Sequence, residues 1–250
     1  VFLGMVFYML QIYLDFSAYS DMAIGMGLMC GLHYCENFNY PYCADSATDF
    51  WRRWHISLST FFRDYVYIPL GGNRHGRKRQ LLNMLAVWLL TGLWHGASWN
   101  YVLWGLYWFV WLAGEKLFLH TPYAELPLWK RILRHCGLLA GVWFGWMLFY
   151  FEDLSLFGSA IADLFFRNGF WDLTARLTLL NNLFFLAVAV AACTPLLPAV
   201  VRRVREAAKT TPAWRGFSGA VAVAAPVVLL VLSFLSLVGN TYNPFLYFQF

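Results

Sequence analysis

The chain has 250 residues, of which 60% are hydrophobic, 20% aromatic and only 12% charged. A soluble globular domain carries about 25% charged residues, so this chain has roughly half the charge expected of one. Its hydrophobic residues lie in long blocks, which exclude an ordinary soluble protein and indicate an integral membrane protein. The formal net charge of +5 gathers in short loops, as on the cytoplasmic flanks of membrane helices, and indicates no nucleic-acid partner.

We therefore predict an all-α, polytopic integral membrane protein in which residues 1–250 form a single membrane domain. The chain begins with Val1 in an apolar segment, without a start methionine or a signal-peptide layout, so we expect further helices to precede it. Five cysteines without paired spacing indicate no disulfide framework. Cys30, His33 and Cys35 lack a second pair of ligands, so no metal site is predicted.

The first apolar segment, residues 1–14, predicts the end of a spanning helix. The polar stretch from Asp15 to Asp21 predicts an interruption, after which residues 22–32 resume the helix. Asp15 and Asp21 are acids at or near membrane depth, where an acid pairs with an arginine or has a structural role. We interpret both as structural residues that pair or cap the break at Ser17–Ser20.

Residues 37–50 are polar and aromatic with a proline, which predicts a loop ending in a helix cap at Ser46 or Thr48. The following segment, residues 49–67, predicts one amphipathic helix in the membrane interface. Its apolar stripe contains Trp51, Trp54, Leu58, Phe61, Tyr65 and Ile68, and its polar face contains Arg52, Ser59 and Arg63. His55 lies at the border of the two faces, where these residues alone favour an ordinary interfacial histidine.

The apolar run from Leu81 to Gly114 is too long for one straight span of about 20 residues. Gly92, Gly96 and Ser98 supply a break, so we predict two helical pieces that meet at His95, either as two short crossings or as a re-entrant pair. Further spans are expected at residues 136–151, 181–201 and 217–238, with a polar connection at 152–176 and basic patches at 74–79, 130–134 and 202–215.

His95 is the chemical candidate that the residues single out, because a polar group inside a membrane faces a cavity or a partner. A histidine in a wet pocket takes a proton from an attacking hydroxyl near neutral pH, which suits acyl transfer to an alcohol. No Gly-x-Ser-x-Gly elbow accompanies it, so direct attack with a base is favoured over a serine triad. Two alternatives stay open: a structural imidazole bonded to Ser98, Asn100 or a carbonyl, and a proton relay in a transporter. The transporter predicts inverted repeats, and comparing the two halves reveals none.

Four blocks resemble the membrane-bound O-acyltransferase (MBOAT) family, and within it the bacterial members that acetylate exported polysaccharides such as alginate. The blocks are QIYLDFSAYSDMAIGMG (11–27), FWRRWHISLSTFFRDYVYIPLGG (50–72), LTGLWHGASWNYVLWGLY (90–107) and YNPFLYFQF (242–250). The resemblance implies a multi-helix MBOAT-like bundle with catalytic histidines at His95 and His55. Other residues in these blocks become candidates for substrate-binding or supporting roles, namely Trp94, Ser98, Asn100, Arg52, Arg53, Trp54, Asp15, Tyr19, Ser20 and Asp21.

The resemblance also implies a function. An acetyl group would pass from a cytoplasmic donor, such as acetyl-CoA or an acyl carrier protein, towards hydroxyls of an alginate-like exported polysaccharide. No bound cofactor is expected; the partners are membrane lipid, the polysaccharide acceptor and periplasmic acetyltransferase proteins, in a multi-pass protein of the bacterial inner membrane. His95 would act as general base, and His55 would orient the donor or stabilise the oxyanion. The alternatives on the same fold are D-alanyl transfer to teichoic acid and O-acetylation of peptidoglycan.

Overall fold

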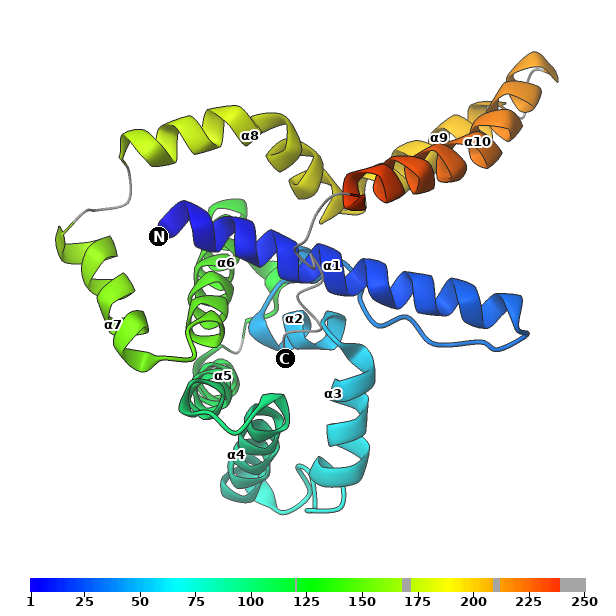
Figure 1. Ribbon diagram of the computed structural model, residues 1–250. Coiled ribbons are helices and arrows are strands. Elements are labelled where there is room, and N and C mark those ends of the chain that lie inside the picture. The colour runs from blue at the N-terminus through cyan, green and yellow to red at the C-terminus, as the bar shows by residue number, and fades with distance from the viewer. Residues whose placement is uncertain (120, 168–171, 209–211, 239–250) are drawn as a thin grey trace. The chain divides into compact units, whose positions relative to one another are not determined.

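The computed structural model describes residues 1–119, 121–167, 172–208 and 212–238. Every regular element in these residues is helical, as predicted (Figure 1). The chain divides into two compact units, Val1–Cys193 and Thr194–Gln249, and each is described by itself. The single membrane domain over residues 1–250 stays a prediction, and the tail block Tyr242–Phe250 lies outside the described residues.

The first helix, α1, runs without a break over Phe2–Met29, so the predicted interruption at Asp15–Asp21 is wrong. The Ser17 hydroxyl donates to the carbonyl of Leu14 one turn earlier, a bond within the helix that leaves α1 continuous. Ser20 is buried against the following loop. The polar residues therefore lie within one continuous helix and do not interrupt it.

The prediction of one amphipathic helix over residues 49–67 is also wrong, because the structure divides this segment into several shorter helical elements. After a short 3₁₀ turn (η1, Pro41–Cys43), α2 spans Ala47–Arg53, α3 spans Ile56–Phe62, and a π-helical turn, η2, covers Arg63–Tyr67. Ser46 caps α2 by accepting from the Asp49 N–H at 3.0 Å, as one of the two predicted caps. The helical path stops because the Arg53 carbonyl and the Ile56 N–H bond to Asn39 and Asn37 of the preceding loop.

The two helical pieces predicted around His95 are confirmed. Helix α4 covers Gly76–His95 and ends at that histidine, and α5 covers Trp99–Phe118. Glycines let the backbones of this pair meet closely. A Cβ added at Gly105 would lie 2.3 Å from the Trp88 carbonyl oxygen, and one at Gly92 would lie 2.4 Å from that of Tyr101.

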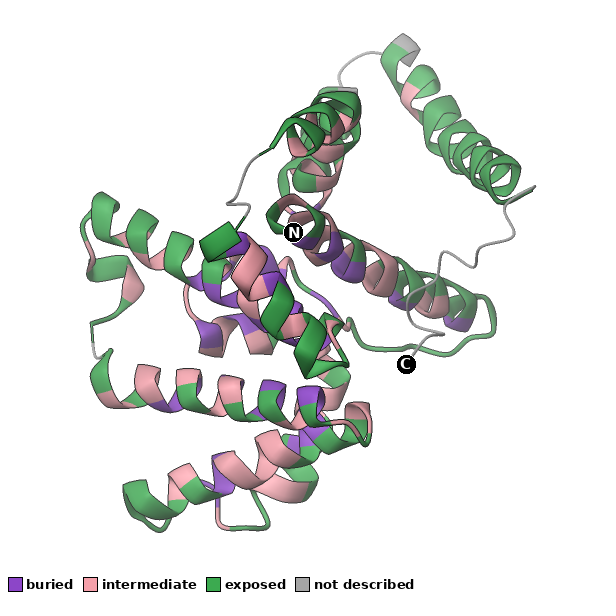
Figure 2. Ribbon diagram, turned by 60° about the vertical axis from the view of Figure 1, so that its left-hand side comes forward, coloured by how far each residue is buried: buried purple, intermediate pink, exposed green. Residues whose placement is uncertain are grey.

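The apolar span predicted at residues 136–151 belongs to a longer helix, α6, which covers Leu128–Tyr150 and follows a 3₁₀ turn (η3, Tyr123–Glu125). Helix α6 packs against α1 and α5. Figure 2 shows the buried residues gathered on the helices of this first unit, and the core is rich in large aromatic rings: Trp54, Trp104, Trp108, Trp146, Phe50 and Phe149.

The polar connection predicted at residues 152–176 contains helix α7 (Leu154–Ala162) and a π-helical turn, η4 (Asp163–Arg167). The span predicted at 181–201 is instead α8, Leu173–Ala192, which stops before Pro195, a residue without a backbone donor. The second unit holds α9, Leu196–Ala208, and α10, Pro212–Leu237. The basic residues expected in a loop at 202–205 lie on α9.

Four of the described helices are long and apolar enough to cross a membrane: α1, α6, α8 and the part of α10 from Trp214 to Leu237. The apolar windows of α8 and α10 contain no buried residue; exposed residues predominate on α10, and exposed and half-buried residues alternate on α8. Apolar helices without protein cover find their cover in lipid, so the chain is a multi-pass membrane protein.

The backbone crossing of α4 and α5 predicts the effect of filling it. Gly105→Ala places a methyl group against the Trp88 carbonyl, so we expect a loss of about 1–3 kcal/mol in the free energy of unfolding. Thermal unfolding in detergent measures the change. Gly114→Ala on the same helix is the matched control, because its Cβ meets nothing within 4 Å; equal midpoints for the two variants would contradict the prediction.

Candidate active site

One pocket of about 280 Å³ lies between the broken helix of residues 47–67 and the α4–α5 pair. Thr48, Trp51, Arg52, Trp54, His55 and Ser59 line it from the first side, and Trp88, Thr91, His95 and Lys116 line it from the second. The structure thus brings together the two histidines predicted from separate blocks of the sequence. The roles of these two residues in catalysis stay a prediction.

His55 stands at the break between α2 and α3 in the left-handed backbone conformation, with φ 44° and ψ 57°. This conformation costs a residue with a side chain about 1–2 kcal/mol, so other contacts must hold it. The imidazole Nδ1 accepts from the Leu58 N–H at 3.3 Å and thereby caps α3. The ring lies edge-on to Phe16 of α1, with centroids 4.8 Å apart.

His95 is the last residue of α4, and aromatic rings surround its imidazole. The centroids of Trp94, Trp104 and Phe149 lie 4.9, 5.1 and 5.0 Å from that of His95. Within the part of the chain that the structure describes, no hydrogen bond to the ring is found, so the alternative of an imidazole bonded to Ser98 or Asn100 receives no support. Both ring nitrogens remain open to a ligand.

Neither histidine lies in one of the four candidate spans. Burial lowers the pKa of His55 from 6.5 to about 4, because the charged imidazolium loses its hydration. Burial, together with the neighbouring His55, lowers the pKa of His95 from 6.5 to about 3. Both rings are therefore neutral at pH 7, and a neutral imidazole has one nitrogen that accepts a proton and one that donates.

The supporting residues predicted near the histidines take different positions. Arg52 and Trp54 line the pocket, whereas Arg53 does not and forms an ion pair with Asp49 at 2.9 Å. Trp94 lies edge-on to both imidazoles, with its ring centroid 6.0 Å from that of His55. The side chain of Trp94 thus bridges the two histidines.

Two further predicted residues begin the helix after His95. Ser98 is the N-cap residue of α5, although its side chain makes no capping hydrogen bond. Asn100 is fully buried, and its amide donates to the Phe149 carbonyl at 3.0 Å. Neither residue lines the pocket, so they belong to the packing behind His95.

The candidates on α1 do not line the pocket. Asp15 lines a different cavity, between α1 and α8, and Tyr19 and Asp21 are exposed. Ser20 is buried, and its hydroxyl accepts from the Asn37 amide at 3.2 Å. Through Asn37, Ser20 contacts the segment that carries His55.

The sequence analysis missed Glu115, whose carboxylate holds the start of α2. It accepts from the backbone N–H groups of Ala47 at 2.6 Å and Thr48 at 2.9 Å, and from the Thr48 hydroxyl at 2.8 Å. A carboxylate at a helix N-terminus also meets the positive end of the helix dipole. An acid inside the apolar run of α5 is the signal that could have revealed it.

The charges around the pocket are all of one sign. Arg52, Arg63 and Lys116 are its charged lining residues, and no acidic side chain lines it. Arg63 is paired with Asp64 at 2.7 Å. Among the described residues, Arg52 and Lys116 form no ion pair with an acidic side chain, so they favour an anionic ligand.

The arrangement can therefore place a neutral base and a neutral hydrogen-bond donor on opposite sides of a largely apolar pocket, next to Arg52 and Lys116, which form no ion pair among the described residues. This set suits a proton transfer coupled to attack on a carbonyl group, with an anionic portion of one reactant at the cations. Three or more His, Cys, Asp or Glu side chains gather nowhere in the described residues as metal ligands would.

Comparison with known proteins gives the same class. The family model of the MBOAT, membrane-bound O-acyltransferase family matches residues 1–161. The probable alginate O-acetylase AlgI of Pseudomonas putida is 42% identical over 267 residues, which cover 99% of this chain and 53% of that protein. The chain thus spans about half the length of the curated alginate relatives it matches.

Two relatives carry other names. The peptidoglycan O-acetyltransferase of Helicobacter pylori is 48% identical over 118 residues, 47% of this chain and 21% of that protein. The teichoic acid D-alanyltransferase of Bacillus subtilis is 33% identical over 154 residues, 57% of this chain and 39% of that protein. Because the family model matches more than half of its length and a relative is 42% identical over nearly all of it, the chain belongs to the membrane-bound O-acyltransferase family.

Proposed function

We propose that the protein is a membrane O-acyltransferase that moves an acetyl group from a thioester donor to hydroxyl groups of an exported, alginate-like polysaccharide. The observation that carries the proposal is that His55 and His95 line one pocket of an MBOAT chain. The similarity to a probable alginate O-acetylase over nearly the whole chain supports the choice of acyl group and acceptor.

In the proposed reaction His95 is the general base. Its neutral imidazole takes the proton of the acceptor hydroxyl as the oxygen attacks the thioester carbonyl, so that a carbon–oxygen bond forms. When the carbon–sulfur bond breaks, the imidazolium returns the proton to the departing thiolate. The surrounding rings of Trp104 and Phe149 support this role, because they exclude the water that would compete with the acceptor.

His55 is proposed to donate a hydrogen bond to the oxyanion formed in this reaction. A backbone N–H can only donate, so the bond from Leu58 requires a lone pair on Nδ1 and puts the proton of neutral His55 on Nε2. Nε2–H is then the group available in the pocket. A fixed donor of this kind stabilises the charge that develops on the carbonyl oxygen.

The donor is proposed to be acetyl-CoA or an acetylated carrier protein, both of which carry phosphate next to the thioester arm. Arg52 and Lys116 are the two pocket cations that form no ion pair among the described residues, and they would meet the phosphate. We further propose a location in the bacterial inner membrane, with the donor on the cytoplasmic side. Periplasmic acetyltransferase proteins would then complete delivery to the polymer.

Replacing the base tests the function. His95→Ala removes the proton acceptor, so we expect acetylation of the polymer to fall at least about a hundredfold while the protein still accumulates in the membrane. The measurement is the acetyl content of alginate, by mass spectrometry, in cells lacking the gene and complemented with each variant. Unchanged acetylation in the His95→Ala strain would refute the assignment.

The same experiment separates the acceptors. Loss of acetyl groups from peptidoglycan, or of D-alanyl esters from teichoic acid, with alginate unaffected would replace the polysaccharide proposed above by that polymer. The relatives from Helicobacter pylori and Bacillus subtilis are the reason to measure both.

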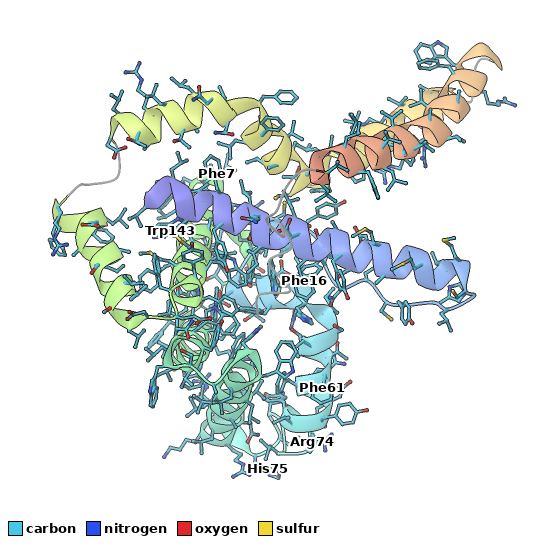
Figure 3. All side chains as sticks on the ribbon, in the orientation of Figure 1. Phe7, Phe16, Phe61, Arg74, His75 and Trp143 are labelled. Atoms are coloured by element: carbon cyan, nitrogen blue, oxygen red, sulfur yellow. The ribbon has the colours of Figure 1, made fainter. Side chains whose placement is uncertain are left out.

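The cations predict a change in donor affinity. Arg52→Ala should raise KM for acetyl-CoA about tenfold with kcat changed by less than about threefold, because a phosphate contact is equally present before and during the chemical step. Initial rates in membrane vesicles measure both constants. Arg74→Ala, in the exposed loop before α4 and outside the pocket (Figure 3), is the control; equal KM values for the two variants would count against the phosphate contact.

The lowered histidine pKa values predict the pH dependence. A base with a pKa of about 3 keeps its lone pair as the pH falls through 6.5, and its partner with a pKa of about 4 stays neutral as well. We therefore expect kcat/KM to stay level from pH about 7.5 to about 5.5. A pH series in membrane vesicles checks this, and an acidic limb centred near pH 6.5 would contradict it.

A further inference from the structure

Asn37 makes most of the hydrogen bonds that hold the turn carrying His55, and Asn39 adds one from its backbone N–H to the Arg53 carbonyl. The Asn37 carbonyl accepts from the Ile56 N–H at 2.9 Å. Its side-chain oxygen accepts from the Ser57 N–H at 3.1 Å and from the Ser57 hydroxyl at 2.9 Å. Its side-chain nitrogen donates to the Ser20 hydroxyl at 3.2 Å. Asn37 thus bonds the two residues that follow His55 and joins them to α1.

The chemistry of these partners fixes the orientation of the Asn37 amide. The Ser57 N–H can only donate, so the amide must turn its oxygen towards α3 and its nitrogen towards Ser20. All its hydrogen-bonding atoms except one N–H then have partners. A side chain bonded on both sides in this way is held in a single position.

Asn37 is connected to the imidazole of His55 through one intermediate residue, Ser57. The Ser57 hydroxyl that it binds lies 3.3 Å from Nδ1 of His55, and the Leu58 N–H that donates to Nδ1 follows directly in the chain. The left-handed backbone at His55 turns this nitrogen back onto the first turn of α3. Fixing Ile56 and Ser57 therefore fixes which imidazole nitrogen faces the backbone and which remains for the pocket.

We propose that Asn37 is a positioning residue for the acyl transfer: through Ile56 and Ser57 it holds the His55 turn so that Nε2–H is presented to the acyl carbonyl. This inference rests on the proposed function. Because Asn37 does not line the pocket, it acts on the reaction through His55 and leaves the binding of the donor unchanged.

The test separates kcat from KM. Asn37→Ala removes both bonds to Ser57 and leaves the backbone bond to Ile56, so kcat for acetyl transfer should fall about tenfold or more while KM for the donor stays within about twofold. The assay uses membrane vesicles that contain the protein and retain the periplasmic acetyltransferase proteins, supplied with radiolabelled acetyl-CoA and alginate oligosaccharides. The conservative variant Asn37→Asp keeps an oxygen facing Ser57 and should retain kcat within about threefold of the wild type.

Asn39→Ala is the matched control, because this asparagine lies in the same loop with an exposed side chain and bonds the turn only through its backbone N–H. We expect wild-type rates from it. If Asn37→Ala matches this control, or if Asn37→Asp is as slow as Asn37→Ala, the proposal is overturned.

A third variant covers the case in which Asn37→Ala does not accumulate. Ser57→Ala removes only the hydroxyl bond and should lower kcat several-fold with KM unchanged; a wild-type kcat would then overturn the proposal. The failure of the proposed function is a different result. In that case the wild-type vesicles themselves transfer no acetyl group to alginate, whereas failure of the present inference leaves the wild type active and the Asn37 variants equally so.

Discussion

Between Arg53 and Ile56 the chain leaves the helical path, and its backbone groups bond to residues 37 and 39 of the preceding loop. This exchange of partners creates the left-handed turn at His55, places its imidazole in the wall of the pocket and starts α3 in a new direction. In a single straight helix over residues 49–67, His55 would lie at the border between the apolar and polar faces of that helix. The two histidines can face one pocket because the cost of the turn is offset by these hydrogen bonds.

The second wall of the pocket is rigid for a different reason. Glycines at the crossing of α4 and α5 bring the two backbones into contact, and large indole rings fill the space around the end of α4. His95 therefore ends its helix inside an aromatic cage, where an imidazolium would be poorly solvated. The aromatic rings that hold His95 in place also bury its imidazole and thereby lower its pKa.

Glu115 couples the two walls. It lies on α5, next to the pocket cation Lys116, and its carboxylate accepts three hydrogen bonds from the first residues of α2. Because α2 carries Arg52, Trp51 and Trp54, the position of this carboxylate sets the position of one side of the pocket relative to the other. Proposed donor binding and proposed catalysis thus share one structural support.

The sequence by itself determined what depends on composition and on near neighbours: the all-helical membrane class, a cap at Ser46 or Thr48, and a break that puts His95 at a helix end, although Gly92, predicted as part of that break, lies inside α4. It also supplied both histidines, through blocks that resemble the MBOAT family. Only the tertiary structure decided that residues 49–67 break at His55, that α1 continues through Asp15–Asp21, and that Asn37 and Glu115 hold α2 and α3. The break at His55 and the contacts of Asn37 and Glu115 rest on hydrogen bonds between residues distant in sequence, such as Glu115 to Thr48, and no local periodicity or propensity encodes such partners.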